Sequence, residues 1–284
     1  MIGFVNVYKP KGLTSFQVVA KLKKIYNTKR VGHLGTLDPM AEGVLPIAIG
    51  KTTKFFDYFL KKDKTYEAVF KCGILTDTLD AEGEIKETND YIPTLQKVQN
   101  ASEKFVGKIQ QIPPKFSAKK INGIRAYSIA RSGKDFELKP NQVEIYGILA
   151  TRGADDSLFN LKIHCSSGTY IRSLGVDILR SVNALGTMVK LVRTRSGFFK
   201  IEDSYMLEEI EKNPQKCLLP VNEVLPNLEI LSLTDEQFFK LKNGVSINID
   251  LPNNDYLVKY IDTFLGLGVI ENKILKLKIN IFEE

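Results

Sequence analysis

The apolar residues of this chain change between the two-residue repeat of a strand and the 3.6-residue repeat of a helix, without a regular order. Residues 65–73, TYEAVFKCG, and 159–165, FNLKIHC, alternate between apolar and polar positions as half-buried strands do. Residues 15–26 and 171–182 place their apolar side chains on one helical stripe instead. Because these elements do not follow the β–α–β rhythm of a parallel sheet, the pattern predicts an α+β fold, with a mixed, largely antiparallel sheet flanked by helices.

Other segments give the same two signals over shorter stretches. Short apolar runs bounded by loops indicate buried strands, and capping residues ahead of periodic stretches indicate helix starts. The further expected elements are a strand at 2–8, a helix capped by Ser15, a strand at 43–50, helical residues from Lys51 to Leu60, a helix from Leu95 to Phe105, a basic helix after the Pro-rich residues 112–116, and a helix begun by Ser167 or Thr169.

A possible domain junction lies at residues 219–231, LPVNEVLPNLEIL, which hold two prolines near a change of charge. Residues 1–225 contain 34 basic and 24 acidic side chains, whereas residues 226–284 contain 6 and 9. Short strand patterns with Asn-Gly and Asn-Asn turns follow the junction. A chain of 284 residues suits one large and one small domain. We therefore expect domains at 1–225 and 228–284, the second a small β-rich module.

Composition excludes several classes of protein. At 43% hydrophobic and 26% charged residues, the chain has the balance of a soluble globular protein. The longest apolar run, Val44–Ile49, is too short to cross a bilayer, and the first residues lack the pattern of a signal peptide. Three widely spaced cysteines and only two histidines argue against disulfides and against a zinc site. We expect a cytoplasmic protein without a metal.

The net charge of +7 is unevenly distributed. Residues 1–71 contain 13 basic and 5 acidic side chains, and residues 115–140 contain 7 and 2. Two basic clusters on one chain suggest a polyanionic partner, above all nucleic acid. A solvated, lysine-rich surface without a partner explains the charge alone equally well.

Gly50-Lys51-Thr52 reads like the end of a nucleotide-binding P-loop, G-x-x-x-x-G-K-[ST]. The first glycine of that motif would have to stand at position 45, which is Leu45, followed by Pro46. Proline lacks the N–H group that such a loop offers to phosphate. We therefore expect no nucleotide cofactor, and we interpret Lys51 as a helix-start or RNA-facing lysine.

Asp38 stands in a differently shaped loop, GHLGTLDP at 32–39. Gly35 permits a positive φ angle, and Pro39 biases Asp38 away from the helical region. The loop therefore presents a single carboxylate. The ordinary alternative for an Asp-Pro pair is an Asx-turn, in which the carboxylate bonds the backbone two residues further on.

The motifs occur in an order found in one family. They are KPKGLTS at 9–15, GHLGTLDPMAEGVLPIAIGKTTKF at 32–55, KTYEA at 64–68 with TDTLDAEG at 76–83, IPPKFSAKKINGIRAYSIAR at 112–131, and CSSGTYIRSLGVDI at 165–178. Over nearly all of residues 1–200 the chain resembles the bacterial tRNA pseudouridine-55 synthases of the TruB type. FLGLGVI, at 264–270, is similar to a strand of the PUA-like module that often closes these enzymes.

The resemblance implies an isomerisation of one uridine, in which the glycosidic bond is cut, the base turns, and C5 is joined to the sugar. Nothing is added or removed, so the resemblance implies no cofactor, metal or ATP. Asp38 matches the catalytic aspartate of the family. It could attack C1′ as a nucleophile or remove the C2′ proton, and the sequence leaves both possibilities open.

Four more residues match positions at the family's site. His33 matches the histidine that enters the RNA loop where the target base was, and Tyr66 matches the tyrosine that stacks on the flipped base. Leu191 matches the leucine that packs on that base, and Arg172 matches the arginine that pairs with the aspartate. Taken alone, the first three are also consistent with a loop histidine, an inward strand residue and a core leucine. Arg172 falls in the first turn of a helix, where the dipole disfavours a cation by about 0.3–1 kcal/mol, so we expect an anion beside it.

The remaining matches concern RNA binding. Lys9 and Pro10 match the motif that braces the catalytic loop, and Lys9 also counts as a substrate-binding candidate. The basic segment Lys119–Lys134 matches the insertion that closes over the RNA; its candidate contacts are Lys119, Lys120 and Arg125. Many relatives have Leu-Arg-Arg where this chain has Leu191-Val192-Arg193, which removes one basic contact.

The expected partner is tRNA, bound as a T-arm stem-loop by a monomer with no membrane attachment. Two other functions would use the same basic surface. One is an RNA-binding or chaperone protein that folds tRNA without modifying it. The other is a synthase that acts on ribosomal RNA. Asp38, Tyr66 and Arg172 argue against a pure binder, which gains nothing from a carboxylate near phosphates.

Overall fold

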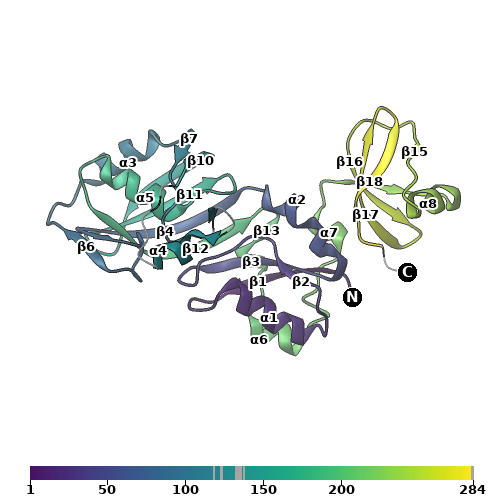
Figure 1. Cartoon of the computed structure of the whole chain (residues 1–284), viewed down its shortest axis with the longest axis horizontal. Helices are drawn as coiled ribbons and strands as arrows, with labels where there is room; N and C mark the ends of the chain where they lie inside the picture. Colours follow the sequence, from purple (N-terminus) through teal and green to yellow (C-terminus); the bar gives the residue numbers. More distant parts are fainter. Residues whose placement is uncertain (118, 122–123, 132–135, 137, 283–284) are drawn as a thin grey trace.

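A computed structural model describes residues 1–117, 119–121, 124–131, 136 and 138–282. The molecule is elongated, with a large sheet in the middle and a smaller sheet at one end (Figure 1). Helices cover the large sheet, and its strands are mostly antiparallel. This architecture confirms the predicted α+β fold with a mixed sheet.

The large sheet has nine strands, and its main path runs β1-β3-β12-β4-β11-β10-β7. All its pairs are antiparallel except the one between β3 and β12. The strands are β1 (Gly3–Lys9), β2 (Val31–His33), β3 (Glu42–Ile49), β4 (Lys64–Cys72), β7 (Gly107–Gln111), β10 (Asn141–Arg152), β11 (Leu158–Cys165), β12 (Gly186–Ser196) and β13 (Phe199–Lys200). Two small hairpins pair β5 (Ile74–Thr76) with β6 (Ile85–Thr88), and β8 (Lys120–Ile121) with β9 (Ile124–Arg125).

The helical elements are short, and the longest are α1 and α5. They are α1 (Ser15–Ile25), the 3₁₀ helix η1 (Gly50–Phe55), α2 (Phe56–Leu60), α3 (Leu95–Glu103), α4 (Ala126–Arg131), α5 (Ile171–Arg180), the 3₁₀ helix η2 (Ile201–Asp203), α6 (Leu207–Lys212), α7 (Val221–Val224) and α8 (Asp235–Lys242). The predicted helix at Lys51–Leu60 is therefore a 3₁₀ turn followed by a short α-helix. Of the predicted basic helix, the structure describes α4; residues 132–134 lie outside the described part.

The two alternating segments form β4 and β11 and bury the faces that their sequences predict. Ala68, Phe70 and Cys72 of β4 are buried, as are the alternate residues of β11 from Phe159 to Cys165. Helix α5 packs directly on this face, because a Cβ atom on Gly175 would lie 2.0 Å from the ring of Phe70. The contact fixes α5, and with it Arg172, over the middle of the sheet.

Two helix starts differ from the prediction. Thr14, and not Ser15, caps α1, because its side chain accepts the N–H of Gln17 in a capping box. Ser15 is the first helical residue, and its hydroxyl contacts Leu37 instead. Helix α5 begins after Tyr170, so neither Ser167 nor Thr169 is its cap.

The second sheet has five strands in the order β14-β16-β17-β18-β15. They are β14 (Glu229–Ser232), β15 (Ile247–Asn248), β16 (Asp255–Tyr260), β17 (Thr263–Glu271) and β18 (Ile274–Asn280). Helix α8 lies beside them and was not predicted. Leu257, Leu267 and Ile281 share one apolar cluster with residues of the large sheet and of η1, including Phe4 and Phe55.

The Gly50-Lys51-Thr52 triplet helps to join these parts. The N–H of Gly50 donates to the carbonyl of Arg30, and the buried hydroxyl of Thr52 lies 2.7 Å from the carbonyl oxygen of Gly3. The ammonium of Lys51 donates to the carbonyl of Phe282. Lys51 thus stands at a helix start, as predicted, but its charge points to the C-terminal strand. No helix among the described residues is long and apolar enough to span a membrane.

Candidate active site

Asp38 lies in the loop between β2 and β3, close to the parallel contact of β3 with β12. Gly35 in this loop has a φ angle of +142°, which bears out the expected need for glycine. The segment before α1 holds the loop from one side: the N–H of Gly12 donates to the carbonyl of Pro39 over 2.8 Å. The hydroxyl of Ser15 donates to the carbonyl of Leu37 and accepts its N–H. Both neighbours of Asp38 are therefore tied to the start of α1.

Lys9 braces the same loop from within. Its side chain is fully buried, and its ammonium donates to the carbonyls of Leu13 at 2.7 Å, Pro10 at 2.9 Å and Pro39 at 3.3 Å. Burial lowers the pKa of Lys9 to about 8, and the negative charge of Asp38 partly offsets that effect. Because the ammonium is buried and bound to backbone carbonyls, Lys9 supports the loop in this structure, and its place among the substrate-binding candidates stays a prediction.

Arg193 is a second brace, and sequence reasoning missed it. It is the largest fully buried side chain described, with 1% of its surface exposed. Its guanidinium donates to the carbonyls of Gly35 at 3.1 Å, Thr36 at 3.3 Å and Val44 at 2.8 Å. The backbone of Arg193 packs directly against Gly43, since a Cβ atom on Gly43 would lie 2.4 Å from the carbonyl oxygen of Arg193. An arginine two positions after Leu191, on the same face of a strand, is the signal that could have revealed it.

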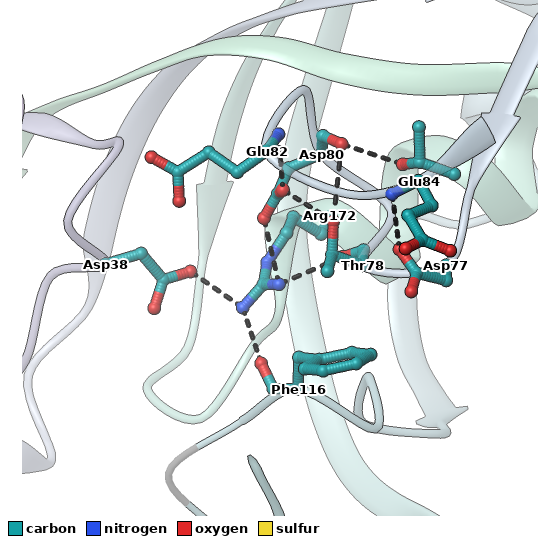
Figure 2. A network of polar contacts seen from close by, with 9 residues as sticks. Asp38, Asp77, Thr78, Asp80, Glu82, Glu84, Phe116 and Arg172 are labelled. Atoms are coloured by element: carbon teal, nitrogen blue, oxygen red, sulfur yellow. Dashed lines mark hydrogen bonds and ion pairs between the residues drawn. The ribbon is translucent and has the colours of Figure 1, made fainter. Parts of the chain in front are cut away.

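Arg172 joins Asp38 to a second carboxylate, Asp80 (Figure 2). One terminal nitrogen lies 2.8 Å from Oδ2 of Asp38, and the other lies 3.0 Å from Oδ2 of Asp80. The guanidinium also donates to the carbonyls of Thr78 at 2.9 Å and Phe116 at 3.0 Å. Each terminal nitrogen of Arg172 thus has two acceptors, and two of the four are carboxylates, which meets the expectation of an anion at this helix start.

Asp80 was not assigned a role from the sequence, although it stands in the TDTLDAEG segment. Its side chain is 6% exposed, whereas that of Asp38 is 41% exposed. Oδ1 of Asp80 accepts the hydroxyl of Thr78 at 2.6 Å and the N–H of Glu82 at 3.1 Å. The segment that carries Asp80 is closed by Asp77, which accepts the N–H of Glu84 (Figure 2). Asp80 is a fixed anchor, and Asp38 is the accessible partner.

Tyr66 and Leu191 lie on the face of the sheet that carries Arg193. Tyr66 of β4 pairs with Arg193 of β12, and Ala68 pairs with Leu191. Burial raises the pKa of Tyr66, as does the charge of Asp38, while Arg193 opposes that rise. Leu191 is 6% exposed and belongs to the main core cluster, so its packing is that of a core residue.

His33 ends β2, five residues before Asp38. Burial, and then the positive charge of Arg193, lowers its pKa, so the ring is neutral at physiological pH. Its Nδ1 atom is buried, and no group among the described residues bonds it. The side chain as a whole is only partly buried, so the rest of the ring is open to contact.

The basic insertion meets the site through Phe116, whose carbonyl binds Arg172. Lys119 follows closely, but its ammonium donates to the carbonyl of Lys139 and to the side chain of Asn141. Its charge is engaged within the protein. Lys120 and Arg125 belong to the β8–β9 hairpin, and their side chains lie outside the described part of the chain.

The arrangement presents one oriented and accessible carboxylate. Oδ2 of Asp38 is held by Arg172, and Oδ1 has no partner among the described residues, so it is available to a substrate. No Asx-turn bond from this carboxylate is found there either. No cluster of His, Cys, Asp or Glu side chains in the described ranges could hold a metal ion. Chemistry here rests on a carboxylate that can act as a nucleophile or as a base.

Comparisons with known proteins agree with this interpretation. Residues 23–171 match the family model described as TruB family pseudouridylate synthase (N terminal domain). The tRNA pseudouridine synthase B of Clostridium tetani is 43% identical over 94% of this chain and 95% of its own length. The enzyme of the same name from Caldanaerobacter subterraneus subsp. tengcongensis is 40% identical over 97% and 98%.

A similar solved structure is described as "Structure of H/ACA RNP bound to a substrate RNA containing 2'-deoxyuridine". It superimposes with a TM-score of 0.74 at 21% identity, covering 99% of this chain and 85% of that chain. This likeness concerns the fold, and it extends over both sheets. The curated relatives are about 40% identical over nearly the whole chain, and this identity shows the family as well as the fold. The chain belongs to the TruB family of pseudouridylate synthases.

Proposed function

We propose that this chain converts uridine 55 in the T-loop of tRNA to pseudouridine, with Asp38 as the catalytic carboxylate. The observation that carries the proposal is the bridge from Asp38 through Arg172 to Asp80, which orients a half-exposed carboxylate at the centre of the sheet. The curated relatives named tRNA pseudouridine synthase B support the choice of tRNA.

The reaction requires the bond between N1 and C1′ to break, the base to turn, and a bond from C5 to C1′ to form. The proton on C5 leaves and N1 gains one, so the product is an isomer of the substrate. Asp38 must be ionised both for attack on C1′ and for removal of the C2′ proton. Arg172 binds one oxygen of this carboxylate at 2.8 Å, which holds the group in place.

The target base must leave its stack to reach Asp38, at a cost of a few kcal/mol. The neutral ring of His33 is suited to fill the gap, because a flat polar ring can stack and hydrogen-bond there. Tyr66 offers a ring for the flipped base, and its raised pKa keeps the hydroxyl protonated. Leu191 would meet the base at the edge of the core, and the segment from Lys119 to Arg125 would close over the RNA.

The chain works in this proposal as a cytoplasmic monomer on the T-arm stem-loop. Three buried free cysteines are compatible with a reducing compartment. Residues 1–225 form the catalytic domain, and 228–284 form a PUA-like module that adds contacts to the RNA outside the loop.

The test compares wild type with Asp38→Asn in single-turnover pseudouridine formation on a T-arm stem-loop, beside the affinity for the same RNA. Asparagine preserves the shape and removes the charge, so we expect a rate loss of several orders of magnitude, each tenfold being about 1.4 kcal/mol of barrier. RNA binding should persist, because a lost negative charge cannot weaken attraction to phosphates. Asp57→Asn, at an exposed position of α2, is the matched control.

A folded Asp38→Asn protein that turns over within about tenfold of wild type would overturn the assignment. Mapping pseudouridine in cellular RNA, with and without the gene, separates tRNA from ribosomal RNA as the substrate. A chain that binds tRNA and forms no pseudouridine would instead support the chaperone alternative.

A further inference from the structure

Helix α1 presents a face that is basic throughout. No acidic residue precedes Asp38 in the sequence. The apolar side chains of α1, including Val18, Val19 and Leu22, are buried against the sheet. The opposite face exposes Lys21, Lys23 and Lys24. None of these lysines forms an ion pair with any residue that the structure describes, so their charges are not neutralised by the protein.

One aromatic ring stands among these charges. Phe16 is 73% exposed, the highest value among the exposed large hydrophobic residues described. Phe16, Ala20, Lys23 and Lys24 follow the spacing i, i+4, i+7 and i+8, which places them on one face of the helix. The row from Phe16 to Lys24 extends about 12 Å at 1.5 Å per residue. A ring left in solvent at the first turn of a helix is not explained by packing.

The row begins beside the catalytic loop. The hydroxyl of Ser15, which precedes Phe16, bonds both the N–H and the carbonyl of Leu37, and the N–H of Gly12 bonds Pro39. Phe16 is thus one residue away from a direct contact with the loop that carries Asp38. Figure 1 shows α1 lying beside β1 and β2 at one side of the large sheet.

We propose that the outer face of α1 is an additional RNA-binding surface, on which Phe16 stacks on an unpaired base of the substrate and Lys21, Lys23 and Lys24 bind its phosphates. Aromatic rings beside a basic track are the means by which proteins hold single-stranded nucleic acid. The proposal rests on the proposed function only in taking the ligand to be the substrate RNA. It adds a surface to the site, next to the target nucleotide, that none of the residues assigned above provides.

The chemistry of the face favours RNA over other partners. A protein interface or a membrane surface would require a broad apolar area, but the apolar stripe of α1 already packs on the sheet. What remains is a single ring among lysines. Such a face can hold one base and its flanking phosphates.

The test measures the affinity of an unmodified tRNA transcript for full-length variants, as a function of salt. Phe16→Ala should weaken binding about 5- to 150-fold, the loss of one stacked base, and Phe16→Tyr should retain it. The double variant Lys21→Gln/Lys24→Gln should reduce the slope of log affinity against log salt by about 0.7 for each phosphate contact. Phe56→Ala, a 39% exposed ring at the start of α2, and Lys104→Gln, an exposed lysine at the end of α3, are the matched controls.

Wild-type affinity and salt slope in the α1 variants would overturn the proposal, as would equal losses in the two controls. If the variants keep their RNA affinity but lose a binding to anionic vesicles that the wild type shows, the face is a membrane surface and the proposal is overturned. Unchanged affinity with a reduced single-turnover rate at saturating enzyme would show that Phe16 acts only on the loop, which also overturns it. The affinity measurement needs no turnover, so failure of this proposal can be distinguished from failure of the wild type to form pseudouridine.

Discussion

Replacing Asp80 with asparagine tests the arginine bridge without touching the accessible carboxylate. The variant keeps Oδ1, which accepts from Thr78 and Glu82. It replaces Oδ2 with an NH₂ group that faces the terminal nitrogen of Arg172, so a donor meets a donor where an ion pair stood at 3.0 Å. The guanidinium then loses one of its two carboxylates.

The expected magnitudes follow from the burial of Arg172, which is 7% exposed. Losing a hydrogen bond to a charged group costs about 1.5–3 kcal/mol of stability, and losing a whole buried ion-pair partner costs about 3–5. Asp38 still provides a counter-charge, so the lower range applies. A guanidinium that moves by about 1 Å carries Asp38 with it, and misplacement of that size costs on the order of 100-fold in rate.

The assay is single-turnover pseudouridine formation at saturating enzyme, with denaturant unfolding and RNA affinity measured in parallel. Affinity should be unchanged, because Asp80 is buried beneath Arg172. Asp77→Asn is the control, since Asp77 lies in the same segment and accepts the N–H of Glu84 without contacting Arg172. A folded Asp80→Asn protein with a rate within about threefold of wild type would refute the reasoning. So would an equal loss in the control.

Three further predictions concern the bracing of the loop and the second sheet. Gly43→Ala should lower the unfolding free energy by roughly 1–3 kcal/mol, because the φ of Gly43 is +101° and a Cβ there would lie 2.4 Å from the carbonyl oxygen of Arg193. Gly12→Ala is the control: its φ is +91°, no atom lies within 4 Å of its Cβ, and it should cost less in the same thermal unfolding assay. The single-turnover rate should fall above about pH 8, where buried Lys9 loses a proton and a donor to the loop. A rate that stays flat to pH 9.5 would contradict the role of Lys9. The pKa of Lys9 in the folded chain is below the ordinary 10.5, so the unfolded chain binds more protons between pH 8 and 10.5. The contribution of Lys9 to the free energy of unfolding therefore rises with pH in that range. Deleting residues 228–284 should lower thermal stability by uncovering the shared apolar cluster, and should leave single-turnover chemistry on bound RNA nearly intact; a collapse of that rate in a folded protein would show that the module helps to build the site.

Periodicity predicted two central strands that alternate cleanly and missed two that do not. β4 and β11 keep a strict two-residue repeat, and both were expected. β12 is equally central, but its pairing with β4 shifts register between Met188 and Lys190 and again between Arg193 and Arg195. Each irregularity changes which residues face the core, so the sequence of β12 does not alternate. β10 was missed for the same reason, because a shift lies between Ile145 and Gly147.

In the candidate site, too, some residues could be recognised from the sequence and others only from the fold. Asp38, Tyr66 and Arg172 were found because they stand in motifs with a recognisable order, and the place of Arg172 at a helix start predicted its anionic partner. Asp80 and Arg193 were not assigned, because their roles depend on contacts across 92 and up to 158 residues of sequence. A buried cation within a strand and a carboxylate within a turn become informative only when the fold brings their partners to them.

Arg172 and Arg193 divide the task of holding Asp38. Arg172 binds the carboxylate itself, so it fixes the direction in which Asp38 points. Arg193 donates to backbone carbonyls on either side of the loop, and Lys9 donates to that of Pro39, so these two fix the path of the chain. Because the backbone is held independently of the side chain, Asp38 can remain 41% exposed to a substrate and still point in one direction. This separation also explains why one oxygen of the carboxylate is free for chemistry, since none of the bracing contacts among the described residues uses it.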